Sequence, residues 1–255
     1  MNRPFSISER NLSIAWARVL AELLKPGTDQ LHPVVISITC PEKESDIEDP
    51  HIRQRLDKEL QSRGQNSCNT VANTIFPFSM WNSSAKDDAD LLYRRYEKAW
   101  PVISKCPANR NGVYFRRLTA YEPRNSKGVP VNQLKFIAKT YLSGNHRKSA
   151  LQAAVLDPTR DHTNNRQKGF PCLHQVAFTP IDDGGLSVAG FYATQYHFEK
   201  AYGNYLGLYR LGRFMAKQLK LRLAQVVCIA AVLDRGSISK TDLVPLVGKV
   251  QAFLR

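Results

Sequence analysis

Apolar side chains recur at helical spacing through the first part of the chain and predict a series of amphipathic helices. The first is expected to begin at a cap formed by Ser6 or Ser8, to run to Leu24 and to end at Lys25-Pro26-Gly27. A compact β-branched run over 34–39 then predicts a buried strand, and the acidic stretch after it, 41–50, predicts a solvated loop. Further helices are expected over 52–63, 87–100 and 133–142.

The second half of the chain is richer in strands. Residues 149–156, 172–179 and 186–192 are the strand candidates, and the sequence Asp182-Asp183-Gly184-Gly185 predicts a hairpin turn between the last two. A long helix with one buried face is expected over 204–221. No internal repeat or flexible linker divides the sequence. We therefore predict a single α+β domain over residues 1–255, with a mixed or mainly antiparallel sheet flanked by helices.

The charge of the chain is strongly positive, with 36 Lys and Arg against 22 Asp and Glu and a net charge of +14. This excess favours anionic partners such as nucleotides, nucleic acid or an acidic protein surface, although a basic surface without a specific ligand gives the same count. Arg94 and Arg95 stand between Tyr93 and Tyr96, which fits either a basic aromatic surface for nucleic acid or an ordinary solvated helix face.

The five cysteines are dispersed and form no CxxC pair, so a reduced, cytoplasmic environment is expected rather than a disulfide framework. The first residues lack the apolar core of a signal peptide, and the longest apolar run, 226–233, is too short to span a bilayer. Histidines 162, 174 and 197 match no zinc-ligand spacing, so no metal is expected. The absence of P-loop, GxGxxG and GxSxG motifs leaves ATPase, Rossmann oxidoreductase and α/β-hydrolase functions without support.

A set of short segments stands in a characteristic order between residues 109 and 221. Gly112-Val113-Tyr114-Phe115-Arg116-Arg117 is followed by Asn132-Gln133-Leu134, Asn145-His146-Arg147-Lys148, Phe170-Pro171-Cys172, Asp183-Gly184-Gly185-Leu186-Ser187 and Tyr202-Gly203-Asn204-Tyr205. In this order and spacing the segments resemble thymidylate synthase and its relatives, the pyrimidine-nucleotide hydroxymethylases. The resemblance rests on the ordered set, and before residue 109 only the opening helix with Ala15-Trp16 carries it.

The resemblance implies a thymidylate-synthase-like fold and a transferase that modifies C5 of a pyrimidine. In that family a cysteine thiolate adds to C6 of the ring, which makes C5 nucleophilic toward a one-carbon unit. Cys172 stands in the nucleophile's position. Such a thiol needs partial exposure and nearby positive charge to lower its pKa. The residues alone are equally compatible with a small, buried strand cysteine.

By the same resemblance, further residues contact the substrate. Asn204 matches an asparagine that bonds the O4 and N3 edge of the base, where an amide suits uracil better than cytosine; a helix cap is the alternative. Tyr114 matches a tyrosine of the polar network near the base, with a half-buried strand aromatic as the alternative. Arg147 matches an arginine that reaches across a dimer to the neighbour's phosphate, and Lys148 replaces its partner arginine.

The remaining candidates are less direct. Glu59 is a candidate for the family's water-holding glutamate, although a solvated helix glutamate fits as well. His197 is a candidate to replace part of a lost charged contact, with a surface or core histidine as the alternative. Arg117, in the arginine pair that ends the first segment, is a candidate substrate ligand.

The sequence departs from the family where phosphate and ribose would be held. The family's Arg-Ser-x-Asp follows the hairpin, but this chain has Tyr192-Ala193-Thr194-Gln195-Tyr196-His197 there. The family's His-x-Tyr is replaced by the apolar stretch 227–232, and its early Arg-Thr-Gly-Thr loop by Leu31-His32-Pro33. Each lost charge-assisted contact costs about 1.5–3 kcal/mol, so ordinary dUMP is not the expected substrate.

We therefore expect a C5 methyl- or hydroxymethyltransferase for a non-standard uracil-type nucleotide, with 5,10-methylenetetrahydrofolate as the implied one-carbon donor. The alternatives are an inactive binding or regulatory protein with the same fold and, on charge alone, a nucleic-acid-binding protein. A homodimer with back-to-back sheets is implied by the resemblance. The predicted site comprises Cys172, Tyr114 and Glu59 as catalytic residues and Asn204, Arg147, Lys148, His197 and Arg117 as substrate-binding residues.

Overall fold

One open β-sheet organises the part of the chain that the structure describes. The structure is a computed structural model that describes residues 4–122, 128–144, 146–164 and 169–251. The strands are β1 Phe5–Glu9, β2 Gln30–Leu31, β3 Val34–Thr39, β4 Gln152–Ala154, β5 Leu173–Ile181, β6 Gly185–Tyr196 and β7 Arg222–Asp234. In this part of the chain they form a seven-stranded sheet in the order β1-β3-β7-β6-β5-β4, with β2 paired to β7.

The sheet is mixed, as the sequence prediction allowed. β1 is parallel to β3 and β6 is parallel to β7, whereas the other neighbouring strands are antiparallel. The parallel pair β6–β7 requires a crossover, which α8 (Tyr202–Leu219) provides. Because β3 from the start of the chain pairs with β7 from near its end, both halves of the sequence contribute to one sheet and one core.

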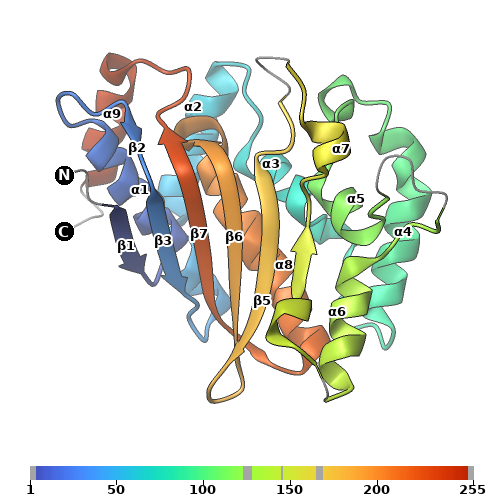
Figure 1. Ribbon diagram of the computed structural model, residues 1–255. Helices are drawn as coiled ribbons and strands as arrows, with labels where there is room; N and C mark the ends of the chain where they lie inside the picture. Colours follow the sequence, from blue (N-terminus) through green and yellow to red (C-terminus); the bar gives the residue numbers. More distant parts are fainter. Residues whose placement is uncertain (1–3, 123–127, 145, 165–168, 252–255) are drawn as a thin grey trace.

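A layer of helices covers one face of this sheet (Figure 1). α1 (Leu12–Leu23) and α3 (Cys68–Ile75) pack against α8, and α8 packs against β6 and β7. Phe76 and Phe214 are among the large side chains that are fully buried in this layer. The other helices are α2 Pro50–Ser62, α4 Asp88–Ile103, α5 Tyr114–Thr119, α6 Gln133–Leu142, α7 Pro158–Asp161 and α9 Lys240–Gln251.

Two glycines of α8 allow α3 to approach it closely. A Cβ at Gly203 would lie 2.5 Å from Cβ of Val71 and 2.8 Å from the carbonyl oxygen of Cys68. A Cβ at Gly207 would lie 2.9 Å from Cβ of Ile75. Residues four apart on a helix share a face, so both glycines present bare backbone to α3. The contact between the two helices depends on the absence of side chains at these positions.

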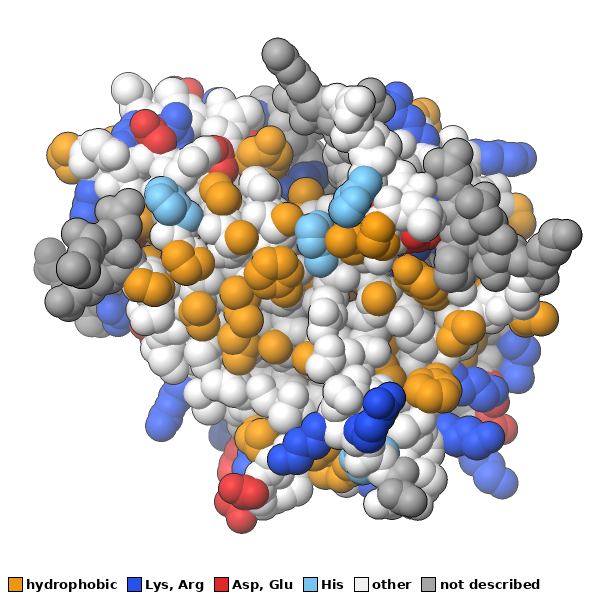
Figure 2. Space-filling model, in the orientation of Figure 1, with side chains coloured by type: hydrophobic (Ala, Val, Ile, Leu, Met, Phe, Trp, Pro, Cys, Tyr) orange, Lys and Arg blue, Asp and Glu red, His pale blue; other side chains and the backbone are white. Residues whose placement is uncertain are grey.

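The opposite face of the sheet is not covered by a described helix (Figure 1). Its central side chains are apolar and are cross-strand neighbours, because Ile229 pairs with both Val35 and Phe191, and Ala189 pairs with Val227 and Ala177. Figure 2 shows hydrophobic side chains gathered at the centre of this face and charged ones nearer its margin. Phe191 is 40% exposed. We call Val35, Ala177, Ala189, Phe191, Val227 and Ile229 the open sheet face.

Several predicted elements are confirmed. The helix over 133–142 and the strand over 34–39 have the predicted bounds, and the predicted turn joins β5 to β6. Asp183 and Gly184 adopt φ values of +61° and +68°, as in the tight turns that suit a hairpin. The helices predicted over 52–63 and 87–100 are α2 and α4 with shifted ends, and α8 begins and ends two residues before the predicted 204–221.

Other predictions were wrong, mostly where elements are short. Residues 5–9, where a helix cap was predicted at Ser6 or Ser8, form β1; the cap of α1 is Asn11, whose side chain accepts from the amides of Ser13 and Ile14. The strand predicted over 149–156 shortens to β4, because a 3-10 turn occupies Lys148–Ala150. A 3-10 turn, Glu44–Ile47, also interrupts the predicted loop over 41–50. The elements that were not predicted are β1, β2, α3, α5, α7, β7 and α9.

Candidate active site

Cys172 lies at the edge of the sheet where β5 begins and β6 ends. It is half-buried and directly precedes β5, after the cis peptide bond between Phe170 and Pro171. Its carbonyl oxygen accepts a hydrogen bond from the amide of Ala193 at 3.0 Å, and its own amide donates to Tyr114 Oη at 3.2 Å. Ala193 therefore stands beside Cys172, and either it or Thr194 occupies the position for which the resemblance implies an arginine.

Tyr114 is held against Cys172 by a short helix. It is the first residue of α5, which corrects the alternative of a strand aromatic. Its ring packs on Phe170 with the ring centroids 5.0 Å apart. Burial raises the pKa of Tyr114 above the ordinary phenol range, so its hydroxyl keeps its proton at neutral pH. We call Cys172, Tyr114 and Phe170 the Cys172 cluster.

The Cys172 thiol is not strongly activated by its surroundings. Burial raises its pKa, while the Lys200 ammonium and a hydrogen bond with Tyr114 lower it, and the net direction is upward. The sequence led us to expect partial exposure and a nearby cation that lowers the pKa. Both features are present, but burial outweighs them, so the thiol form dominates at neutral pH.

Asn204 presents a buried amide with unused hydrogen-bonding capacity. It is 5% exposed and lies inside continuous helical backbone, because a π-helical turn, His197–Ala201, runs directly into α8. The helix-cap alternative is therefore wrong. Its side chain makes no hydrogen bond to another residue in the ranges that the structure describes. Its amide is not among the fully buried polar atoms that lack a partner, so the amide keeps contact with solvent and is available to a ligand that offers both a donor and an acceptor.

Lys200 was not recognised in the sequence. It lies four residues before Asn204, so the two residues stand about one helical turn apart on the same side. It is the cation that lowers the pKa of the Cys172 thiol. A lysine in the first turns of a helix carries no signal of its own, and only the fold brings it toward the start of β5.

Two buried tyrosines complete the surroundings of Cys172. Tyr192, which pairs in register with Leu173, lies near Cys172 and Tyr114, and Tyr205 lies near Tyr192. The hydroxyls of Tyr192 and Tyr205 are buried and have no hydrogen-bond partner. Burial raises the pKa of both groups well above the phenol range. The region thus offers neutral donors and acceptors rather than charges.

His197 is a core residue. It is fully buried and stacks on Trp16, with ring centroids 5.3 Å apart and an interplanar angle of 8°. Its Nε2 bonds to the carbonyl oxygen of Trp16 at 3.0 Å, and the Trp16 indole donates to the carbonyl oxygen of His197 at 3.2 Å. Burial lowers the pKa of His197 to about 3. The structure therefore places it against α1, as in the core alternative, and its side chain is not accessible to a ligand.

Glu59 lies near the end of α2, on the side that contacts α9. Its carboxylate pairs with Arg63 at 3.0 Å, and Arg63 also approaches Asp242 of α9 at 3.5 Å. These contacts correspond to the solvated-helix alternative. Helix α3, rather than α2, packs along α8 next to Asn204, so the described contacts do not bring Glu59 to the Cys172 cluster.

Arg117 is engaged in a buried ion pair. Its guanidinium donates to Asp161 at 3.1 Å and to the carbonyl oxygen of Val155 at 3.1 Å. It also lies over the ring of Phe170, 5.4 Å from the centroid. Arg117 therefore contacts the Cys172 cluster through Phe170. Its Nη1 and Nη2 nitrogens already donate to Val155 and Asp161.

A cavity of about 470 Å³ adjoins the Cys172 cluster on the side where Arg117 lies. Gly112 lies in its wall, and a Cβ there would come within 2.6 Å of the Phe170 ring. Arg116 lies over the ring of Trp100 at 4.9 Å and pairs with Glu97. The charged side chains in the wall are mostly arginines, namely Arg110, Arg116, Arg117 and Arg160 against Glu122 and Asp161. This composition favours an anionic ligand.

Comparisons with known proteins do not decide the family. No protein-family model matches the sequence, and no curated protein matches it. Among the described residues, no group of three or more His, Cys, Asp or Glu side chains could hold a metal ion. No helix in the same ranges has the length and apolar character needed to cross a membrane. The site must therefore be interpreted from its own geometry.

Arg147 and Lys148 lie apart from these contacts. Both are exposed and lie at the start of the 3-10 turn Lys148–Ala150 that precedes the edge strand β4. Neither side chain forms an ion pair with a carboxylate in the described part of the chain. Their charges are thus available to an anion, either in solution or on a neighbouring molecule.

Proposed function

We propose that this protein binds a uracil-type pyrimidine nucleotide between Cys172 and Asn204 and modifies its C5 position. The observation that carries the proposal is the side-chain amide of Asn204, a residue that is 5% exposed and whose amide has no hydrogen-bond partner among the described residues. An amide that donates to O4 and accepts from N3–H satisfies the edge of a uracil ring. Lys200, four residues before Asn204, lowers the pKa of the Cys172 thiol, and Tyr114 accepts from the Cys172 amide at the start of β5.

The proposed chemistry is covalent catalysis by the thiol. After loss of its proton, Sγ of Cys172 forms a bond to C6, the C5–C6 double bond opens, and the negative charge is delocalised to O4 as an enolate. C5 then attacks a one-carbon electrophile of the formaldehyde oxidation level, whose carbon–heteroatom π bond breaks so that the heteroatom takes up the electron pair. Loss of the C5 proton and cleavage of the Sγ–C6 bond restore the ring and the thiolate. Tyr114 would position the nucleophile, because its oxygen holds the Cys172 amide.

The thymidylate-synthase-like fold is part of this proposal. The segments that resemble the family occur in space as a cysteine before β5, a β5–β6 hairpin and a helix that carries Asn204. A mixed sheet with helices on one face agrees with it. Folate is implied only by the resemblance: the arginine-lined cavity suits the carboxylates of a folate tail as well as phosphates, so its residues do not identify a folate site. The chemistry above is therefore tested with the nucleotide alone.

A catalytically inactive nucleotide-binding protein is the second candidate. Two observations favour it, namely the raised pKa of the Cys172 thiol and the presence of Ala193 beside it. A binding module needs Asn204 but no thiolate. The two functions therefore differ in whether Cys172 reacts.

Exchange of the C5 proton separates the two functions. Addition of a thiolate to C6 and its reversal replace hydrogen at C5 by deuterium in D₂O, which mass spectrometry of UMP, dUMP or a uracil-containing oligonucleotide detects. We expect exchange with the native chain and only background with Cys172→Ser. The rate should rise about tenfold per pH unit above neutrality until the raised thiol pKa is passed.

Each variant has a control in which the same type of residue is changed at an exposed position. Cys106→Ser changes an exposed cysteine and should leave the exchange rate unchanged. Asn204→Ala should abolish the rise in melting temperature that a uracil nucleotide produces, whereas Asn66→Ala, at an exposed asparagine, should retain it. A melting-temperature rise without exchange would support the inactive binding protein. Absence of both responses for every nucleotide would refute both candidates.

We also propose a homodimer through the open sheet face, with Arg147 and Lys148 directed toward the neighbouring subunit's ligand. An uncovered apolar sheet face is a common site of association.

Light scattering should give about twice the chain mass of 28.8 kDa. Phe191→Lys should yield the monomer, because a charge would be buried at the centre of the interface. The matched control Phe136→Lys changes a phenylalanine that is 57% exposed on α6 and should remain dimeric; a monomeric native chain would refute the proposal.

A further inference from the structure

A second cavity lies on a different side of α8 from Asn204. It has a volume of about 350 Å³ and opens between α8, the segment 44–50 and Phe78. Leu206 and Arg210 line it from α8, and residues two apart on a helix, such as Asn204 and Leu206, point about 200° apart. The cavity is thus separate from the Cys172 cluster.

Arg210 is the cation that distinguishes this cavity. Its guanidinium lies over the ring of Phe78, 4.9 Å from the centroid. Its Nη1 donates to Oδ1 of Asn69 at 2.8 Å and to Oδ1 of Asn73 at 3.4 Å, both neutral amides. No carboxylate of the described residues forms an ion pair with it. Burial lowers the pKa of Arg210, while Glu48 and Glu44 act in the opposite direction.

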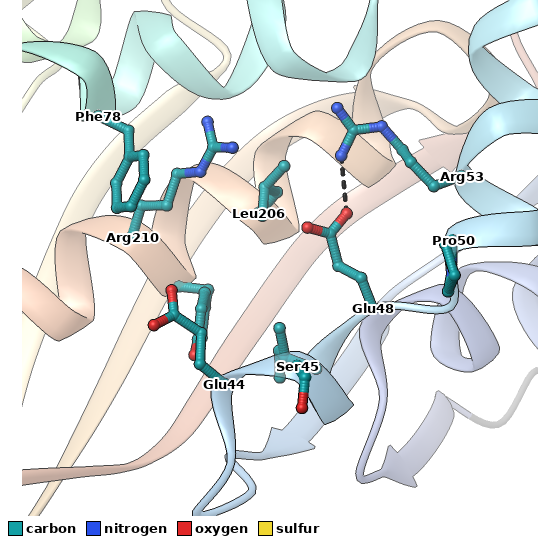
Figure 3. Close-up of a pocket in the computed structure, with 10 residues that line it drawn as sticks. Glu44, Ser45, Glu48, Pro50, Arg53, Phe78, Leu206 and Arg210 are labelled. Carbon is teal, nitrogen blue, oxygen red and sulfur yellow. Dashed lines mark hydrogen bonds and ion pairs between the residues drawn. The ribbon is translucent and has the colours of Figure 1, made fainter.

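The other charges in the wall are already paired. Arg53 pairs with Glu48 at 2.7 Å and with Asp57 at 2.7 Å, and Glu44 pairs with Arg213 outside the wall. Figure 3 shows the Arg210 guanidinium facing, across Leu206, the pair of Arg53 and Glu48. Nη1 is used by the two asparagines, so the N–H groups of Nε and Nη2 remain for a ligand. Among the described residues of this wall, Arg210 is therefore the charged side chain without a direct ion pair.

The surroundings of Arg210 indicate which anion would fit. The carboxylates of Glu44 and Glu48 lie in the same wall and would repel a doubly charged phosphate about twice as strongly as a singly charged carboxylate. A guanidinium binds a planar carboxylate through two parallel hydrogen bonds. Ile47, Leu206 and Phe78 supply an apolar surface beside it, and the volume is at the small end of ligand sites. We propose that this cavity binds a small monocarboxylate with an apolar body, whose carboxylate pairs with Arg210.

Titration calorimetry of the full chain tests this site. The probes are naphthalene-2-carboxylate, octanoate, the neutral 2-naphthamide and inorganic phosphate. At least one carboxylate should bind saturably with one site per chain, and Arg210→Gln should weaken it at least about tenfold. The amide and phosphate should bind at least about tenfold more weakly than that carboxylate. Arg18→Gln, which changes an arginine paired with Glu9 outside the cavity, should bind like the native chain.

A second measurement on the native chain keeps the test independent of how the variant folds. In a titration followed by NMR, the backbone amides of Ile47, Leu206 and Tyr209 should shift with the bound fraction. Absence of saturable binding by both carboxylates would overturn the proposal. So would shifts confined to other parts of the chain, equal affinity for amide and carboxylate, or tighter binding of phosphate. None of these readouts depends on chemistry at Cys172. Failure of this proposal can therefore be distinguished from failure of the proposed function.

Discussion

Replacing Gly203 by alanine should lower the free energy of unfolding by about 2–3 kcal/mol. The new Cβ would meet Cβ of Val71 at 2.5 Å and the carbonyl oxygen of Cys68 at 2.8 Å. The carbonyl belongs to the backbone of α3 and cannot turn away as a flexible side chain could. Alanine favours a helix over glycine by about 1 kcal/mol, which offsets only part of the cost of pushing α3 and α8 apart.

Urea denaturation followed by circular dichroism measures this loss, and a second glycine provides the control. Gly248 lies within α9, and a Cβ there would meet no atom within 4 Å. Gly248→Ala should therefore leave stability unchanged or raise it by up to about 1 kcal/mol. If the Gly203 variant is as stable as the native chain, α3 and α8 do not approach as closely as described.

Acidification should destabilise the protein through His197. The folded state holds this imidazole neutral, with a pKa of about 3, whereas in the unfolded chain it has its usual value of about 6.5. Below 6.5 the unfolded state takes up the proton first, so the stabilisation is present above pH 6.5 and is lost as the pH falls toward 3. The loss is about 1.4 kcal/mol per pH unit, about 5 kcal/mol at most.

The slope of unfolding free energy against pH between 6.5 and 5 tests this expectation. Other groups titrate as well, so the comparison is with His197→Phe, which removes the titration but keeps a ring that can stack on Trp16. This variant should be less stable at pH 7, because the bond to the Trp16 carbonyl is lost, and its slope should be shallower. His162→Phe, at an exposed histidine, should show the native slope. Equal slopes in all three proteins would show that His197 is not buried in its neutral form.

The elements that could be predicted from the sequence are those whose own pattern determines them. The helix over 133–142 has a cap at Asn132, whose side chain accepts from the amide of Lys135, and the β-branched strand over 34–39 is similarly self-contained. The elements that were missed depend on partners. β7 contains the continuous apolar run 226–233, which periodicity does not separate from a buried helix, and β1 is defined by its pairing with β3.

The candidate site likewise has features that could be predicted from the sequence and features that could not. The order of segments predicted that Cys172, Tyr114 and Asn204 belong to one site. Cys172 donates to Tyr114 through its amide, whereas the role of Asn204 stays a prediction. The environment of each group could not be predicted, because burial is a property of the whole core. Burial raises the pKa of Cys172 despite the nearby cation, and it places His197 against Trp16. Lys200 and Arg210 became apparent only through their neighbours in space.

The pairing of β3 with β7 also determines when this sheet can form during synthesis. Ile36 pairs with Cys228, so the edge of β3 that faces β7 has no partner until residues near 228 have been made, although β1 can pair earlier with the other edge. Contacts between residues so distant in sequence slow folding, because a long loop must close before they form. Until then the open edge of β3 and the apolar sides of α1 and α3 lack their final partners. We therefore expect slow folding, and expect chains shortened before β7 to aggregate rather than to form a stable N-terminal half.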